Sequence, residues 1–576
     1  MSASAHGHRS AVLVSGEAGM GKTSLIRAAI DGARAETLLV GWGTCWHGDG
    51  APGFWPWTQA LGDLVRLVGT DVAVAASGRD HETLSALISD LGPAVASTDD
   101  PDRHRLLLLD AAVRWLEALA ADRHVVIVLD DLQWADSSTF DLLDHVIARP
   151  VGARLLVVGA YRHDELSEQA LARLAGLGAR SDHIHLEGLT VEDVEELVAG
   201  ISDPQTARAR AADLHRRTGG HPLFVSELAR LTDLQAGGVL PAVITGAVAR
   251  RVGTLTDESQ QLLDAASVLG NRLLPDVLGA VIDEAPAEVL RLLGSAKAAG
   301  LIRTFGDGEF WFTHDLFRET LYRHLDATRR SQLHGRIGDA LEARNQRGGL
   351  VSPGDLAYHF TQAAGTGDPA KAIHWAGEAA TDERRRAAFT EAAGHLRRAR
   401  SAALDAGWHI EPDLLVRILI DEADSQARSG EPDLARDLLL HAAKIAPDAT
   451  LQADVALAVQ RLGAKFSAPR NEIIAHLELA LGAVTGVDLA RQAQVTAALA
   501  RELQHSVVDD RLRAGPLSEE ALALGRESGD DATLVGCLLA RHDALWGPGT
   551  GIERAELGHE IAAAGARLRD NDRLAE

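Results

Sequence analysis

The residues best suited to chemistry lie near the N-terminus, where Gly16 to Thr23 match the pattern G-x-x-x-x-G-K-[ST] at every position. Glycines let the backbone turn tightly, so that its N–H groups and the start of the following helix face phosphate oxygens. In such a loop Lys22 neutralises the β- and γ-phosphates, and the Thr23 hydroxyl is a ligand of Mg²⁺. The pattern predicts an ATP or ADP site built from Gly16, Glu17, Ala18, Gly19, Met20, Gly21, Lys22, Thr23 and Ser24.

Charged residues also end two apolar runs that are typical of buried strands. Asp130 and Asp131 end one run, and Arg162 ends the run Ala153 to Arg162. A carboxylate at the carboxyl end of a central strand holds Mg²⁺ opposite the phosphate loop, and we assign that role to Asp130. Asp131 stands where many P-loop ATPases place a water-activating Glu. Arg162 is either a sensor of the γ-phosphate or a surface arginine, and with Lys22 these residues form the predicted catalytic set.

Other candidate sites have incomplete motifs. The sequence contains no G-x-S-x-G nucleophile elbow, and His559 is followed four residues later by Ala563 instead of the second histidine of a zinc-protease helix. A dense aromatic group forms either a packed cluster or a surface for a partner. Its members are Trp42, Trp46, Phe54, Trp55 and Trp57.

The first part of the chain alternates strands and helices. Runs that are apolar throughout suit parallel strands covered on both faces, whereas Lys22 to Arg34 carries apolar residues at helical spacing. We therefore predict an α/β P-loop NTPase domain with a parallel sheet. The expected strands are Ala11 to Ser15, Thr37 to Gly41, His124 to Asp131, Ala153 to Arg162 and His183 to Leu186.

Helices dominate after about Leu166. Thr190 to Asp193 resembles a capping box that opens a helix. Further on, Leu301 to Thr304 and Glu309 to Thr313 flank the turn Gly306-Asp307-Gly308, which predicts a hairpin. Helices followed by a β-hairpin are the layout of a winged helix.

No strand is expected from Ala327 onward. Helical segments repeat with a period near 40 residues, which favours a tetratricopeptide-like (TPR-like) solenoid over the alternative, an irregular helical bundle. Gly237-Gly238 marks a plausible boundary upstream. The predicted domains are 1–170 (P-loop NTPase), 171–236 (helical lid), 237–326 (winged helix) and 327–576 (TPR-like sensor region).

Composition narrows the possible partners. The formal net charge is −25, and no run of Lys and Arg offsets it, so binding to nucleic acid or anionic membranes is not expected. The two cysteines argue against a disulfide scaffold. With neither a signal peptide nor an apolar run long enough to span a bilayer, we expect a cytoplasmic protein.

These segments together resemble the STAND class of signal-transducing P-loop ATPases, and in particular the ATPase and sensor region of large LuxR-type bacterial transcriptional regulators. The resemblance spans most of the first 330 residues. It rests on GEAGMGKTSL (16–25), GAPGFWPW (50–57), VVIVLDDLQWAD (125–136), LLVVGAYRHDEL (155–166), GGHPLFVSEL (219–228) and FTHDLFRETLY (312–322).

The resemblance implies roles that spacing does not. Pro222 matches a proline expected near the adenine, His314 a histidine expected on the β-phosphate of ADP, and Arg162 the sensor position. It also implies a closed ADP form, and an ATP form that opens and self-associates when a small-molecule or protein inducer binds the helical repeats. Two departures are the few residues before Ala11 and the absence of a helix-turn-helix in Gly551 to Glu576, so no DNA-binding domain is evident.

Three functions remain open at this point. The leading hypothesis is a slow ATPase switch from a transcriptional regulator. The second keeps the switch but has it control a partner protein. The third is a protein-interaction scaffold that does not hydrolyse ATP, against which the intact Lys22, Thr23 and Asp130 argue. A vigorous remodelling motor is disfavoured, because no arginine finger is apparent and the water-activating position is Asp.

Overall fold

The computed structural model of the chain describes residues 10–33, 38–45, 52–92, 101–149, 154–178, 180–230, 248–305, 309–463, 470–506, 508–547 and 549–575. These residues fall into two compact units, Met1–Gly407 and Trp408–Glu576. The predicted turn at 306–308, the predicted boundary at 237–238 and Trp46 lie outside the described residues.

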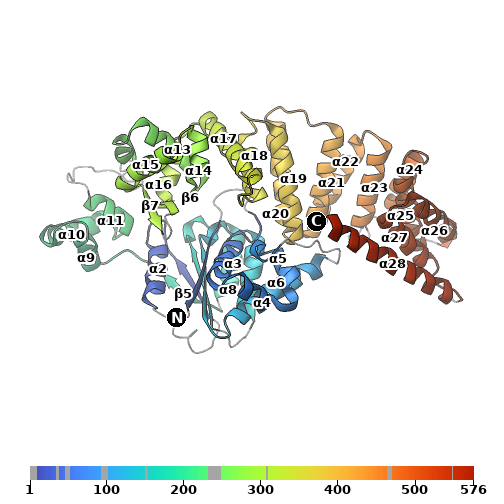
Figure 1. Cartoon of the computed structure of the whole chain (residues 1–576), viewed down its shortest axis with the longest axis horizontal. Helices are drawn as coiled ribbons and strands as arrows, with labels where there is room; N and C mark the ends of the chain where they lie inside the picture. The colour runs from blue at the N-terminus through green and yellow to red at the C-terminus, as the bar shows by residue number, and fades with distance from the viewer. Residues whose placement is uncertain are drawn as a thin grey trace. The chain divides into compact units, whose positions relative to one another are not determined.

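The first unit begins with a five-stranded parallel sheet of order β2-β3-β4-β1-β5 (Figure 1). This confirms the predicted α/β class. The sequence could not supply the order, in which β4 separates the strand before the phosphate loop from the strand that ends in Asp130. The strands are β1 (Ser10–Ser15), β2 (Leu38–Thr44), β3 (His124–Asp130), β4 (Leu155–Tyr161) and β5 (Asp182–His185).

Side chains alternate between the two faces of this sheet, as the period of a strand requires. Leu13 and Ile127 join the core on one face, whereas Val14 and Val126 join the core on the other. Helix α2 packs through Ile26 on the second face. The helices of the sheet domain are α2 (Lys22–Gly32), α3 (Trp55–Val68), α4 (Thr70–Ser77), α5 (His81–Ser85), α6 (Pro101–Leu119), α7 (Ser137–Ala148) and α8 (Glu168–Gly178).

The aromatic group does not form one cluster. Phe54 and Trp57 are fully buried in the core beneath α3, and the Trp57 indole donates to the Thr139 carbonyl oxygen at 3.1 Å. Trp42 points to the opposite face of the sheet, beside Arg27. The expectation of a single packed cluster is therefore wrong for Trp42, because adjacent segments deliver these rings to different layers.

Two small groups of elements follow the sheet. The first holds α9 (Val191–Ala199), α10 (Pro204–Thr218) and α11 (Pro222–Ala229), and α9 opens with the predicted capping box between Thr190 and Asp193. The second has the order of a winged helix and a three-stranded sheet, β6-β8-β7. Its elements are α13 (Asp257–Leu269), β6 (Arg272–Leu273), α14 (Pro275–Ile282), α15 (Pro286–Ala298), β7 (Ile302–Phe305), β8 (Glu309–Phe312) and α16 (Asp315–His324).

Four more helices complete the first unit, and α18, α19 and α20 pack on one another in sequence. They are α17 (Ala327–Gln346), α18 (Pro353–Ala363), α19 (Pro369–Arg385) and α20 (Phe389–Asp405). The connection between α19 and α20 touches the sheet domain, because Arg105 of α6 donates to the Ala387 carbonyl oxygen at 2.8 Å.

The second unit consists of paired helices. Successive helices pack together, and α21, α23, α25 and α27 also contact one another in turn, which is the two-layer pattern of stacked helical hairpins. The starts of these four helices are separated by about 37 to 42 residues, in line with the predicted period. The helices are α21 (Pro412–Arg428), α22 (Pro432–Ile445), α23 (Ala449–Gly463), α24 (Arg470–Val484), α25 (Leu489–Gln504), α26 (Val508–Ser528), α27 (Asp531–Ala544) and α28 (Gly551–Ala575).

None of the described helices combines the length and apolarity that crossing a lipid bilayer requires. Cys45 and Cys537 are both buried free thiols, which confirms that they do not pair.

The packing of α3 on β2 depends on a residue without a side chain. A Cβ added at Gly43 would lie 1.8 Å from the Pro56 carbonyl oxygen. We expect Gly43→Ala to destabilise the first unit by about 1–3 kcal/mol, because α3 must shift off the sheet. Gly176→Ala is the matched control, since a Cβ there meets nothing within 4 Å. Urea unfolding followed by circular dichroism would contradict the packing argument if both variants unfolded at the same midpoint.

Candidate functional site

The phosphate loop joins β1 to α2. Gly19 and Gly21 adopt φ of 85° and 91°, a left-handed conformation that glycine reaches without strain. Lys22 is buried and turns back to the loop, where its Nζ donates to the carbonyl oxygens of Gly16 at 2.8 Å and Glu17 at 2.9 Å. Burial lowers the pKa of Lys22. The loop therefore holds a desolvated ammonium at the point where phosphate oxygens are expected.

The two predicted metal ligands are in direct contact. The Thr23 hydroxyl donates to Asp130 Oδ2 at 2.8 Å, although 107 positions separate the two residues in sequence. Burial and the charge of Asp131 raise the pKa of Asp130 to about 6. A divalent cation beside Thr23 and Asp130 would favour the ionised form of the Asp130 carboxyl and so lower its pKa again.

Arg162 is buried at the carboxyl edge of the sheet, so its surface alternative is wrong. It follows β4, the strand between the phosphate-loop strand and the strand of Asp130. Its side chain is only 5% exposed and lies among four carboxylates. These are Asp131 at 3.6 Å, Glu165 at 3.0 Å, Asp315 at 3.1 Å and Glu319 at 3.4 Å.

This network joins the sheet domain to the winged helix, because Asp315 and Glu319 belong to α16. Burial opposes the charge of Arg162, but the surrounding carboxylates, Asp131 first, raise its pKa above the ordinary value. Asp315 and Glu319 were not among the predicted site residues. Their signal was present in the sequence, since both lie in the quoted segment at 312–322.

Asp131, the predicted water-activating residue, is held in an unusual conformation. Its φ is 58°, which is uncommon for a non-glycine residue and recurs at functional sites. Gln133 Nε2 donates to Asp131 Oδ1 at 2.9 Å, and Arg162 lies on the same carboxylate oxygen. Burial and Asp315 raise the pKa of Asp131 to about 6.

The start of α11 packs on the phosphate loop. A Cβ added at Gly19 would lie 2.8 Å from Leu223 Cδ2 and 3.0 Å from His221 Cε1. His221 Nε2 donates to the Ala18 carbonyl oxygen at 2.9 Å. Pro222, the predicted adenine neighbour, opens this helix between the two contacting residues. The sequence reasoning named Pro222 but missed His221 beside it.

His314 immediately precedes α16 and meets Phe317 edge to face. Burial, together with the charges of Arg303, Arg230 and Arg251, lowers its pKa to about 4. The ring is therefore neutral near pH 7. His221, which is bonded to the phosphate loop, is also among the groups that lower the pKa of His314.

The segment after Asp131 also contacts the helices after the winged helix. Asp136 caps α7 by accepting from Thr139 N at 2.7 Å, and it accepts from Phe54 N at 3.1 Å. Glu391 of α20 accepts from the hydroxyls of Ser137 at 2.9 Å and Ser138 at 3.2 Å. Burial and Glu391 raise the pKa of Asp136 to about 7.

A third carboxylate joins this contact. Glu383 of α19 accepts from Gly53 N at 2.9 Å, and its burial raises its pKa well above the usual range. A Cβ at Gly53 would lie 2.4 Å from that of Ala388. Sequence reasoning missed this contact, because the carboxylates lie far from the motif in the chain.

The space and the free polar atoms at the site are compatible with a bound magnesium–nucleotide complex. Within the described residues, His221 Nδ1 is buried with no hydrogen-bond partner, so it can still accept one. A Cβ at Gly21 would meet nothing within 4 Å, which leaves room at the start of α2. The described residues contain no cluster of three or more His, Cys, Asp or Glu that would hold a metal by itself. Thr23 and Asp130 are thus suited to a cation that phosphate oxygens help to bind.

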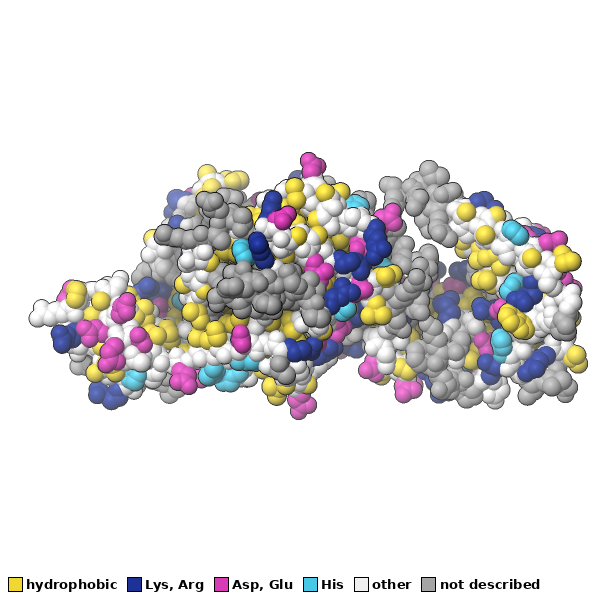
Figure 2. Space-filling model, turned by 90° about the horizontal axis from the view of Figure 1, so that it is seen from below, with side chains coloured by type: hydrophobic (Ala, Val, Ile, Leu, Met, Phe, Trp, Pro, Cys, Tyr) yellow, Lys and Arg dark blue, Asp and Glu magenta, His cyan; other side chains and the backbone are white. Residues whose placement is uncertain are grey.

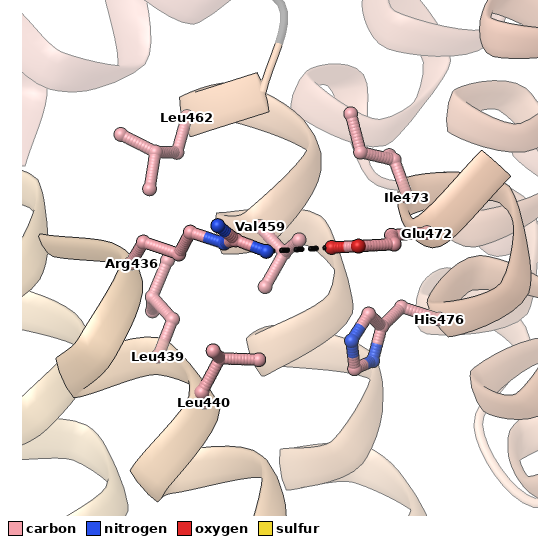
Figure 3. A pocket seen from close by; sticks show the side chains of 8 residues that line it. All are labelled: Arg436, Leu439, Leu440, Val459, Leu462, Glu472, Ile473 and His476. Atoms are coloured by element: carbon pink, nitrogen blue, oxygen red, sulfur yellow. Dashed lines mark hydrogen bonds and ion pairs between the residues drawn. The ribbon is translucent and has the colours of Figure 1, made fainter. Parts of the chain in front are cut away.

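The second unit contains a separate, small apolar cavity of about 20 Å³ between α22, α23 and α24. Figure 3 shows Arg436 reaching across it to Glu472, and the two are 2.7 Å apart. The remaining lining residues are Leu439, Leu440, Val459, Leu462, Ile473 and His476.

The N-terminal part of the chain is similar to a known protein family. Residues 1–158 match the family described as AAA ATPase domain. An uncharacterized protein of Rhizobium meliloti (strain 1021) is 26% identical over 392 residues. That alignment covers 62% of this chain and 37% of the other protein, so the chain spans little more than a third of the relative's length.

Two solved structures align with the chain at low sequence identity and low TM-score. One is a signal transduction ATPase with numerous domains and a tetratricopeptide repeat sensor from Pyrococcus horikoshii, with 15% identity, coverage of 99% of this chain and 83% of that chain, and a TM-score of 0.42. The other is the Aeropyrum pernix ORC1 protein in complex with DNA, with 14% identity, coverage of 55% and 87%, and a TM-score of 0.23. The family match alone, over residues 1–158, includes the phosphate loop, Asp130 and Asp131.

The raised pKa of Asp130 predicts how stability depends on pH. The folded state keeps a proton up to about pH 6, whereas an unfolded Asp loses it near pH 4. Stability without ligand should therefore fall as pH rises from about 4 to 6 and stay lower above that range. We expect Asp130→Asn to raise the free energy of unfolding at pH 8 by about 1–3 kcal/mol, and by less at pH 5. Urea titrations at both pH values, in EDTA, measure this difference, and an equal effect at both would contradict the assignment.

Proposed function

We propose that this chain is a nucleotide-dependent switch that binds ATP or ADP with Mg²⁺ and hydrolyses ATP slowly. The observation that carries the proposal is Arg162. This one buried side chain contacts Asp131 at the end of β3 and Asp315 of the winged helix. Gain or loss of the γ-phosphate would therefore change the contacts of Arg162, and through them the contacts that hold α16. A switch requires such a link between the ligand and a second element.

The chain supplies each part that phosphoryl transfer needs. Lys22 and the N–H groups of the loop bind the phosphates, and Thr23 with Asp130 would hold the cation that neutralises charge on the transferred group. Asp131 is the residue placed to orient a water and accept its proton. In this structure Asp131 Oδ1 is engaged by Arg162 and Gln133, so these contacts compete with a bound water for that oxygen, in keeping with slow turnover.

Arg162 would have a different partner in each state. With the γ-phosphate present, the guanidinium can bind phosphate oxygens in place of Asp315 and Glu319. Losing Arg162 leaves two carboxylates of α16 without their cation, which favours separation of the winged helix from the sheet domain. This exchange gives ATP and ADP different affinities for the two forms.

The helical repeats are the proposed receiver of the signal. They would bind the inducer, a small molecule or a protein, across the surfaces of their stacked helices. Self-association of the ATP form and a place in a LuxR-type transcriptional regulator complete the proposal. The motif segments at 125–136, 219–228 and 312–322 support the regulator assignment.

The first test is the nucleotide that the purified chain carries. We expect ADP to copurify with the parent and to be largely absent from Lys22→Ala, because the variant loses the cation that faces the phosphates. Chromatography of the denatured protein identifies and counts the nucleotide. Arg66→Ala is a matched control, since Arg66 is an exposed residue of α3 that pairs with Asp63 one turn away. Absence of nucleotide from the parent, with no later uptake of ATP or ADP, would sink the proposal.

A second test addresses the exchange at Arg162. We expect Asp315→Asn combined with Glu319→Gln to improve the affinity for ATP relative to ADP by roughly tenfold, because Arg162 no longer gives up two carboxylates. Glu288→Gln is the control, since Glu288 is exposed on α15 and paired with Arg291. Competition against a fluorescent nucleotide measures both affinities. An unchanged ratio in the double variant would mean that Arg162 does not distinguish the nucleotides.

A further inference from the structure

A pocket lined by arginines lies between α11 and the winged helix. It has a volume of about 320 Å³ and is lined by Glu227, Arg230, Arg250, Arg251, Ala298, Ala299 and Gly300. Glu227 and Arg230 come from α11 and its end, Arg250 and Arg251 from the helical residues 248–253, and Ala298–Gly300 from the end of α15. Three segments that are distant in sequence thus converge on it.

The charge of this pocket is opposite to that of the chain. The sequence has 82 acidic against 57 basic residues, yet the pocket has three guanidinium groups and one carboxylate. Glu227 is 4% exposed and is already bonded to Arg251, and it lies 4.0 Å from Arg230. One carboxylate cannot neutralise three cations, so the pocket keeps a net positive charge.

The three arginine side chains differ in how firmly the surrounding residues hold them. Arg251 is held, because it also donates to the Gly300 carbonyl oxygen at 3.4 Å and stacks over the Phe317 ring. The Arg230 side chain is 52% exposed, and Arg250 is exposed as well. A fixed arginine with two solvent-facing arginines beside it can close around an anion without disturbing the fold.

We propose that this pocket binds a small, multiply phosphorylated anion. Its volume lies within the range of small-molecule sites, about 300–1,000 Å³. Planar guanidinium groups bind phosphate oxygens in pairs, and several of them favour a ligand with more than one phosphate group. The site is distinct in its residues from the phosphate loop, and it does not depend on the proposed nucleotide switch.

Such a ligand would act on the same elements as the switch. It would connect α11, whose start covers the phosphate loop, to the winged helix that carries His314. Arg230 and Arg251 are also among the cations that keep His314 neutral, so an anion between them would reduce their effect on it. Occupancy of the pocket would thereby favour one arrangement of α11 and α16.

The experiment titrates inorganic pyrophosphate into the full chain carrying Lys22→Ala, which disables the phosphate loop, by calorimetry at 0.15 M salt. We expect saturable binding with one site per chain. Adding Arg230→Ala and Arg250→Ala should weaken it at least roughly tenfold, since each charged hydrogen bond contributes more than a neutral one. Arg272→Ala with Arg291→Ala is the control, because both arginines are exposed on the winged helix and pair with Glu309 and Glu288.

Three outcomes would overturn the proposal. The first is no saturable binding of pyrophosphate to the Lys22→Ala chain. The second is equal weakening by the pocket pair and the control pair, which would show a general response to charge. The third is binding of citrate as tight as that of pyrophosphate, which would replace phosphate with carboxylate as the recognised group. Circular dichroism of each variant, matching that of the parent, ensures that a loss of binding is not a loss of fold.

Discussion

A single buried guanidinium constrains much of the first unit. Arg162 lies at the carboxyl edge of the sheet, 5% exposed, and a charge so far from water is stable only with carboxylates around it. Two of its partners come from the sheet domain and two from α16, so the winged helix must dock where it does for the charge to be compensated. Removing one side of a buried network of this kind typically costs about 3–5 kcal/mol. A phosphate group is one of the few ligands able to take over the role of the carboxylates.

The ten residues from Asp130 to Thr139 connect Arg162 to three other parts of the first unit: the phosphate loop, the backbone before α3, and α20. Asp130 contacts the phosphate loop through Thr23, Asp131 contacts Arg162, and Asp136 contacts the backbone before α3. Ser137 and Ser138 add a connection to Glu391 in α20. Because the segment is short and its carboxylates are buried, movement at one contact is transmitted to the others. The helices beyond the winged helix thus have a direct path to the end of β3.

Charge is distributed unevenly in this acidic chain. Figure 2 shows acidic and basic side chains interspersed over the described part of the face in view, as on an ordinary soluble surface. The exception is the junction of α11 and the winged helix, where Arg230, Arg250 and Arg251 outnumber Glu227. Their field adds to the effect of burial on His314 and keeps that ring neutral. The basic groups therefore gather beside the proposed nucleotide site, where an anionic ligand is expected to bind.

Short sequence patterns were sufficient to predict the features of this protein that depend on residues close together in the chain. The phosphate loop, the strand that ends in Asp130, the capping box at Thr190 and the helical repeat period were all readable in the sequence, because each depends on neighbours a few positions away. The proximity of Thr23 and Asp130 could be anticipated although 107 positions separate them, because both belong to motifs whose places in a P-loop domain are known. The order of the strands, the burial of Arg162 and the contacts of Asp136 with distant segments were decided only by tertiary structure. They depend on which side chains meet across more than 80 positions of chain, and a buried charge leaves no periodic mark in the sequence that reveals its partners.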